Sequence, residues 1–351
     1  MSRRNPDTGG TGFGSDAIKN GRERMPLADK PLSELVTYRP PLTREADFDA
    51  FWDRTLAAAA QIPLDIHIEA IPDYPVPEIH ASRLTFTGWA GARICGWWLV
   101  PPDSAPGAHN GKRPTMVFYH GYSGNKGYID QYLGWVLQGY CVLTVDVRGQ
   151  SGESTDPKAY PGGHATGWMT QGITDPDHYY YRGAYIDCVR ALDAACAQPE
   201  VDPHRIGITG GSQGGALTLA VAALDPHRRA KVAMADVPYL SHFRRSVEIA
   251  SAPPYTEIAV YCRQWPSREE QVYRTLSYFD CMNLADRIEC PVLMQVGLTD
   301  IICPPSTIYA VYNHLRVATR HANVYPYNGH EGNPAHTYTK LAWARKHVFG
   351  A

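Results

Sequence analysis

The segment Arg205-Ile-Gly-Ile-Thr-Gly-Gly-Ser-Gln-Gly-Gly215 decides the fold. Its β-branched start predicts a short buried strand, and the small residues after Gly214 predict a helix. Between them, Gly210-x-Ser212-x-Gly214 has the spacing of a nucleophile elbow, a sharp turn that exposes a serine between strand and helix. The flanking glycines allow the strand and the helix to approach closely. We therefore predict that Ser212 is a nucleophile, with a purely structural Gly-rich turn as the alternative.

A nucleophilic serine needs a base and an acid that orients the base, and on this kind of sheet they follow the serine in the order Asp, His. Asp300 and His330 each lie a few residues past a predicted strand. Loops at the C-terminal ends of neighbouring parallel strands meet at one edge of a sheet. Ser212, Asp300 and His330 are therefore the predicted catalytic residues. Asp236, which follows the preceding strand, is the rival acid.

Acyl transfer also needs N–H donors for the negatively charged oxygen of the tetrahedral intermediate. The backbone N–H of Gln213 is one candidate because this residue follows the nucleophile. The second candidate is the N–H of Tyr122 in the loop Phe118-Tyr-His-Gly121-Tyr-Ser-Gly124, where the glycines allow a tight bend. A Gly-rich turn without a ligand is the alternative interpretation of this loop.

The rest of the chain alternates between predicted strands and helices. The first strands follow one another directly and the later ones are separated by helices. This order predicts an α/β fold whose mixed sheet becomes parallel and is covered on both faces. Strands are predicted at 81–86, 93–100, 115–119, 141–147, 206–209, 231–235, 292–296 and 323–325. Helices are predicted at 44–60 (opened by Thr43), 130–138, 181–197, 214–224, 306–315 and 336–346, with cap helices at 241–250 and 268–278.

The composition excludes several classes of function. Lys and Arg (33) nearly balance Asp and Glu (35) in the 351 residues, so a nucleic-acid partner is not expected. No run approaches the about 18 apolar residues of a membrane span, so a membrane partner is not expected either. The 22 tyrosines and 8 tryptophans suit a polar, sugar-like ligand.

The eight cysteines form no Cys-x-x-Cys pair. We interpret them as reduced, buried thiols in preference to disulfides or a zinc site. The N-terminus lacks the apolar region of a secretory signal, so a cytoplasmic location is expected. Residues 1–24 are predicted to be a flexible tail because Thr8-Gly-Gly-Thr-Gly-Phe-Gly-Ser15 has no apolar period. Residues 25–351 are predicted to form a single domain.

With these residues assembled, the chain resembles the acetyl xylan esterase / cephalosporin-C deacetylase group, carbohydrate esterase family 7. Three motifs carry the resemblance: Arg148-Gly149-Gln150, Gly210-Gly-Ser-Gln-Gly214 and His330-Glu331. The likeness runs from about Met25 to the C-terminus. Supporting stretches are Tyr38-Arg-Pro40, Asp47-Phe-Asp-Ala-Phe-Trp52, Asp236-Val-Pro238, His242-Phe-Arg-Arg245, Arg274-Thr-Leu-Ser-Tyr-Phe-Asp280 and Ile302-Cys-Pro-Pro-Ser306.

The resemblance implies an α/β-hydrolase fold with an N-terminal helical extension and a helical cap insertion. It implies a triad of Ser212, Asp300 and His330, with Tyr122 and Gln213 as oxyanion donors. Two further groups of residues are matched by it. Pro254 and Tyr255 match a segment that lines a small acyl pocket, and together with Tyr122 they are expected to bind the substrate. Arg148, Gly149, Gln150 and Glu331 match residues with a structural role, in which Arg148 is expected to fork onto backbone carbonyls.

The implied activity is removal of acetyl groups from small acetylated carbohydrates, such as xylo-oligosaccharides, and from cephalosporin C. Neither a metal nor another cofactor is implied, and the implied assembly is a homohexamer. Two enzymatic alternatives remain on the same fold, another short-chain carboxylesterase and a serine peptidase. A remote alternative of another class is a non-catalytic, hydrolase-like binding protein, which would be favoured by the loss of a triad residue.

Overall fold

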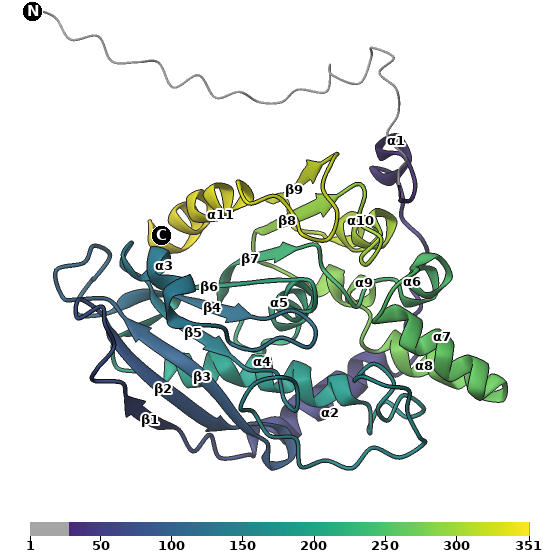
Figure 1. Cartoon of the computed structure of the whole chain (residues 1–351), viewed down its shortest axis with the longest axis horizontal. Helices are drawn as coiled ribbons and strands as arrows, with labels where there is room; N and C mark the ends of the chain where they lie inside the picture. Colours follow the sequence, from purple (N-terminus) through teal and green to yellow (C-terminus); the bar gives the residue numbers. More distant parts are fainter. Residues whose placement is uncertain (1–27, 351) are drawn as a thin grey trace, which may run out of the picture.

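Nine strands form one sheet in the order β1-β2-β3-β5-β4-β6-β7-β8-β9 (Figure 1). The computed structural model describes residues 28–350, so the predicted tail at 1–24 lies outside the described residues. Strands β1, β2, β3 and β5 pair antiparallel, and from β5 onward every neighbouring pair is parallel. The strands are β1 (His67–Ala70), β2 (His80–Thr87), β3 (Arg93–Val100), β4 (Arg113–Tyr119), β5 (Cys141–Val145), β6 (Val201–Gly211), β7 (Ala230–Asp236), β8 (Val292–Gly297) and β9 (Arg320–Tyr325).

Helices cover both faces of this sheet (Figure 1). The prediction of a mixed α/β sheet that becomes parallel is therefore confirmed. The helices are α1 (Leu32–Leu35), α2 (Phe48–Ala60), α3 (Leu133–Val136), α4 (Tyr180–Cys196), α5 (Gln213–Leu224), α6 (Phe243–Ile249), α7 (Tyr255–Gln264), α8 (Glu269–Ser277), α9 (Cys281–Leu284), α10 (Pro305–His314) and α11 (His336–Ala344).

Successive residues of the central strands face opposite sides of the sheet, and each side has its own core layer. In β4 and β5, Met116 and Val142 belong to the layer that includes α3 and α11 residues. Their neighbours Val117 and Leu143 belong to the larger layer that includes α2, α4 and α5 residues. All four side chains are buried. Burial on both faces explains why these strands read as continuous apolar runs in the sequence.

Helix α1 of the N-terminal extension was not predicted, and the start of α2 also differs from the prediction. Helix α2 begins at Phe48, after Asp47 at the N-cap, so the prediction that Thr43 opens the helix is wrong. Thr43 instead pairs with a residue of α9. Its backbone N–H donates to Asn283 Oδ1 (3.0 Å), and Asn283 Nδ2 donates to Thr43 Oγ1 (2.9 Å). The Thr43 side chain thus binds the N-terminal extension to the cap insertion, and it does not cap the N-terminus of α2.

The cap insertion between β7 and β8 contains α6, α7, α8 and α9. The predicted helices at 241–250 and 268–278 are confirmed as α6 and α8, whereas α7 and α9 were not predicted. Strand β1 was also missed. All four of its residues are exposed, so it lacks the alternation of buried and exposed positions by which a strand is recognised.

All eight cysteines lie within residues 28–350 and are free thiols. Five of them are buried, namely Cys95, Cys141, Cys188, Cys281 and Cys303. Packing against apolar neighbours is thus the main role the structure gives them. Among residues 28–350, no helix is both long enough and apolar enough to cross a membrane.

Candidate active site

Ser212 occupies the turn between β6 and α5 with φ 57° and ψ −119°, a conformation that a non-glycine residue rarely adopts. Hydrogen bonds on both sides of the residue hold this strained backbone. The N–H of Ser212 donates to Asp236 O (2.8 Å), and the N–H of Tyr239 donates to Ser212 O (3.0 Å). The turn is therefore fixed by the segment that follows β7, and the Ser212 side chain remains partly exposed.

The glycines around Ser212 are not equivalent. A Cβ atom on Gly214 would overlap the carbonyl oxygen of Tyr119, and one on Gly210 would lie 2.5 Å from the same oxygen. A Cβ on Gly211 would meet its nearest neighbour, Asp236 Cβ, at 3.9 Å, which is an ordinary contact. Close approach of β4 and α5 therefore requires glycine at 210 and 214 but not at 211.

This difference makes a prediction about stability. Gly214→Ala is expected to lower the free energy of unfolding by about 2 kcal/mol or more, because the backbone of β4 cannot yield to the added methyl group. Gly211→Ala is the matched control and is expected to change it by no more than about 0.5 kcal/mol. Urea unfolding followed by circular dichroism measures both. Equal stability of the two variants would contradict the packing described above.

The structure joins the three predicted catalytic residues into one hydrogen-bonded chain. His330 Nε2 lies 2.9 Å from Ser212 Oγ, and His330 Nδ1 lies 2.9 Å from Asp300 Oδ2. Asp300 is completely buried. Its other oxygen accepts hydrogen bonds from the N–H groups of Ile302 and Cys303, both at 2.8 Å. These donors replace the water that a buried carboxylate loses, and they orient it toward the imidazole.

The rival acid, Asp236, does not contact His330. Its carboxylate faces α11, where Lys340 Nζ lies 2.7 Å and His336 Nε2 lies 3.2 Å away. Burial raises the pKa of Asp236, but Lys340 and His336 lower it by more than burial raises it. The pKa of Asp236 is therefore below its usual value. The Asp236 side chain is thus part of a separate ion-paired cluster with residues of α11.

Glu331 supports the loop that carries His330. Its carboxylate accepts hydrogen bonds from the N–H of Gly329 (3.0 Å) and from Asn328 Nδ2 (3.1 Å). The Gly329 N–H is the largest of the causes that lower the pKa of Glu331. This contact pattern agrees with the structural role that the resemblance implied.

The two candidate oxyanion donors flank Ser212. Gln213 is the first residue of α5, where an α-helix leaves N–H groups without an intrahelical acceptor. Tyr122 follows Gly121, and a Cβ on Gly121 would lie 3.8 Å from Ser212 Cβ. The loop turns back immediately, because the N–H of Gly124 donates to Gly121 O (3.0 Å). Both main-chain segments therefore lie against the serine.

Gln150 connects these two segments. Its Oε1 accepts from the N–H of Ser123 (2.9 Å), and its Nε2 donates to Gln213 Oε1 (2.9 Å). Gln213 Nε2 donates back to Gln150 Oε1 (3.1 Å), and the hydroxyl of Tyr181 also donates to Gln213 Oε1 (2.9 Å). The amide pair therefore fixes the spacing between the loop of Tyr122 and the start of α5.

Arg148 is completely buried and anchors the loop that carries Gln150, mainly by binding a carboxylate. Its Nε and Nη2 donate to the two oxygens of Asp187 at 2.6 and 2.9 Å, and Nη2 also donates to Trp89 O (2.8 Å). The expected fork onto backbone carbonyls is therefore only partly right. At Gly149, φ is 61° and a Cβ would lie 2.9 Å from Asp156 Cβ, so glycine is needed there.

Pro254 and Tyr255, at the start of α7, are both buried. The ring of Tyr255 packs on Tyr239, with ring centroids 4.3 Å apart, and the hydroxyl of Tyr255 accepts from the N–H of Ser241 (3.1 Å). Since Tyr239 is bonded through its N–H to Ser212, these rings lie beside the elbow. With its hydroxyl occupied, Tyr255 offers an apolar surface.

One residue that contacts the candidate site was missed. Glu257 of α7 accepts hydrogen bonds from the hydroxyl of Tyr122 at 2.9 and 3.0 Å. Because α7 itself was not predicted, its first turn was not considered as part of the site. An acidic residue close after Pro254-Tyr255 was the available signal.

The ligand atoms of Asp300, Cys303 and His330 lie within 4.8 Å of one another, a spacing that could hold a metal ion. Two of the three are already joined by the hydrogen bond that links His330 to Asp300. A metal bound to all three would replace that hydrogen bond. These three residues are therefore better suited to orienting the His330 imidazole than to holding a resident metal ion.

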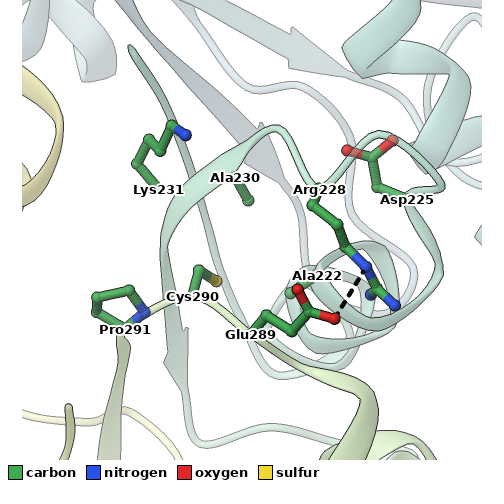
Figure 2. A pocket seen from close by; sticks show the side chains of 8 residues that line it. All are labelled: Ala222, Asp225, Arg228, Ala230, Lys231, Glu289, Cys290 and Pro291. Carbon is green, nitrogen blue, oxygen red and sulfur yellow. Dashed lines mark ion pairs between the residues drawn. The ribbon is translucent and has the colours of Figure 1, made fainter. Parts of the chain in front are cut away.

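A cavity of about 260 Å³ lies away from this site (Figure 2). It is found where β7 and β8 begin, whereas Ser212 follows the opposite, C-terminal end of β6. Figure 2 shows Arg228 paired with Glu289 across it, with 3.4 Å between Nε and Oε1. Ser212, Asp300 and His330 do not line this cavity. Its lining residues are Ala222, Asp225, Arg228, Ala230, Lys231, Glu289, Cys290 and Pro291.

Strand order and the position of the serine turn after β6 place the protein among the α/β-hydrolases, the class to which its structural neighbours belong. A sequence model of the acetyl xylan esterase family (AXE1) matches residues 25–347, and the chain belongs to this family. It is accordingly a carboxylic ester hydrolase. The family resemblance seen in the sequence is thereby confirmed.

Several relatives are similar over most of the chain. An acetyl xylan esterase from Paenibacillus sp. R4 has a TM-score of 0.87 and 46% identity, over 91% of this chain and 100% of that one. Acetyl xylan esterase 1 from Thermoanaerobacterium sp. JW/SL YS485 has a TM-score of 0.84 and 34% identity, over 91% and 99%. The acetyl esterase Axe7A of Xylanibacter ruminicola is 30% identical over 319 residues, which cover 88% of this chain and 69% of that protein.

Proposed function

We propose that this protein is a serine esterase that removes acetyl groups from small acetylated carbohydrates such as xylo-oligosaccharides. The observation that carries the proposal is the continuous chain from Ser212 Oγ through His330 to buried Asp300, with 2.9 Å at each link. This is the arrangement that nucleophilic acyl transfer requires. Membership of the acetyl xylan esterase family supports acetyl as the acyl group.

In the first step, His330 Nε2 takes the proton of Ser212 while Oγ attacks the acetyl carbonyl carbon. Asp300, bonded to Nδ1, keeps the neutral ring in the required tautomer and stabilises the imidazolium that forms. The N–H groups of Gln213 and Tyr122 bind the oxyanion, each lowering the barrier by about 3 kcal/mol. The carbon–oxygen bond to the sugar then breaks, and His330 returns the proton to the leaving alcohol.

In the second step, water attacks the acetyl group on Ser212. His330 accepts a proton from this water, and the same N–H groups bind the second oxyanion. Collapse of the intermediate breaks the bond to Oγ and releases acetic acid, which ionises to acetate, while His330 returns its proton to Ser212 Oγ.

The buried surfaces of Pro254 and Tyr255, together with Tyr122, are proposed to limit the acyl group to a small one. In a series of acetate, butyrate and octanoate esters of one alcohol, kcat/KM is expected to fall at least about 10-fold from acetate to butyrate. Initial rates at limiting substrate measure this. A rise in kcat/KM with chain length would favour an ester hydrolase for longer acyl chains, and faster cleavage of a peptide amide would favour a peptidase.

We also propose three finer properties, of which the first two rest on the resemblance. Cephalosporin C is proposed as a second substrate because its acetoxymethyl group presents the same acetyl ester, and acetate release from it is the test. A homohexamer is proposed as the assembly, which light scattering measures. A cytoplasmic location is proposed because all eight cysteines are free thiols, as in a reducing compartment, and fractionation of cells tests it.

A further inference from the structure

Glu257, in the first turn of α7, connects the cap to two loops of the candidate site. Its carboxylate accepts from the hydroxyl of Tyr122 (2.9 and 3.0 Å) and from the N–H of Met169 (3.2 Å). The N–H of Trp168 in turn donates to the hydroxyl of Tyr122 (2.6 Å). One phenol–carboxylate pair thus joins α7, the loop after β4 and the segment 168–169.

The surroundings leave Glu257 and Tyr122 little room to move. At Gly167, φ is +104°, and a Cβ there would overlap the Glu257 carboxylate. The ring of Tyr122 packs edge-on against Trp168, with centroids 5.3 Å apart, and against Tyr239 at 6.2 Å. The side chain of Tyr122 is therefore fixed while its main chain lies next to Ser212.

The carboxylate of Glu257 is held by neutral donors. Within residues 28–350, no Lys, Arg or His side chain forms an ion pair with it. The titratable groups that face it are phenols, those of Tyr122 and Tyr179. Burial, opposed by the hydrogen bonds of Tyr122 and Met169, raises the pKa of Glu257 to about 7. The Glu257 carboxyl group therefore changes its charge near neutral pH.

We propose that Glu257 is a positioning residue of the esterase: its carboxylate holds Tyr122 so that the Tyr122 N–H points to the oxyanion formed at Ser212. This inference rests on the proposed function. The number of acceptors explains why the charged form is needed. Oε2 accepts from both Tyr122 and Met169, and Oε1 accepts from Tyr122. In a neutral acid or an amide, a donor group stands in place of one of these two acceptor oxygens. Either change removes one of the two acceptors of the Tyr122 hydroxyl and so weakens the hold on this side chain.

The test compares Glu257→Gln with Glu248→Gln, the same change at an exposed position of α6. At about pH 8, kcat on an acetyl ester is expected to fall roughly 10- to 100-fold in Glu257→Gln, with KM changed less. The ratio of wild-type to variant kcat is then expected to approach one at about pH 5.5, because protonated Glu257 resembles the amide. Glu248→Gln is expected to match the wild type at every pH.

A second variant, Tyr122→Phe, removes the hydroxyl but keeps the proposed N–H donor. Its loss of kcat is expected to match that of Glu257→Gln, and the double variant should lose no more than either one. Additive losses, a kcat ratio that does not change with pH, or unchanged activity of Glu257→Gln would overturn the proposal.

Hydrogen exchange of the peptide that contains Trp168 and Met169 separates this inference from the proposed function. Exchange is expected to speed up in Glu257→Gln but not in Glu248→Gln, whatever the activity. Unchanged exchange would overturn the positioning role of Glu257. If the wild type releases no acetate while Glu257→Gln still shows faster exchange than Glu248→Gln, the proposed function is overturned and the loop contacts of Glu257 remain supported.

Discussion

Replacing Ser212 with alanine is expected to lower kcat for acetate release by roughly 10⁶-fold. The alanine side chain cannot attack the acetyl carbonyl, and without an acyl-enzyme the reaction depends on direct attack by water. Binding should change little, because the proposed oxyanion N–H groups belong to the main chain. Acetate release from an acetylated xyloside measures the loss.

The control for this variant is Ser33→Ala, an exposed serine in α1, which is expected to keep full activity. Circular dichroism establishes that both variants are folded. Acetate release by Ser212→Ala at more than about one hundredth of the wild-type rate would show that another group is the nucleophile.

Replacing Asp300 with asparagine is expected to lower kcat by about 10⁴-fold. Asp300 Oδ2 accepts from His330 Nδ1, and this fixes the tautomer in which Nε2 can take the proton of Ser212. An amide that presents its NH₂ group to Nδ1 favours the other tautomer. The geometry of the site would be kept while its base was lost.

Asp236→Asn is the matched control for Asp300→Asn, because Asp236 pairs with Lys340 and lies outside the chain that links Ser212 to His330. It is expected to lower the thermal midpoint but to leave kcat within about 10-fold of the wild type. A larger loss of kcat in Asp236→Asn than in Asp300→Asn would mean that the two aspartates had been assigned in reverse.

The elbow and the central strands could be predicted because their causes are local. Gly210, Ser212 and Gly214 lie within five consecutive residues, and the glycine requirement follows from the close approach of β4 and α5. Strands buried on both faces give continuous β-branched and apolar runs, which the sequence displays directly. The loops after β8 and β9 could be placed together because parallel neighbours end at the same edge.

What escaped prediction depends on contacts between distant parts of the chain. Glu257 and Tyr122 are 135 residues apart, and the two members of the Gln150–Gln213 pair are 63 apart. Thr43 meets its partner across 240 residues. No local pattern marks these pairs, because the two partners become neighbours only in the folded chain. The motif at Arg148 predicted that this side chain anchors its loop, but it did not predict that Asp187 accepts the hydrogen bond.

The most direct measurement is to identify the acetylated residue during turnover. Wild-type enzyme mixed with excess acetyl ester, quenched in acid and digested, is expected to carry one acetyl group on Ser212 by mass spectrometry. The same adduct should be absent in Ser212→Ala and in a sample incubated with acetate alone. Acetylation of a different residue, or none at all while acetate is being released, would contradict the acyl-enzyme mechanism proposed for this esterase.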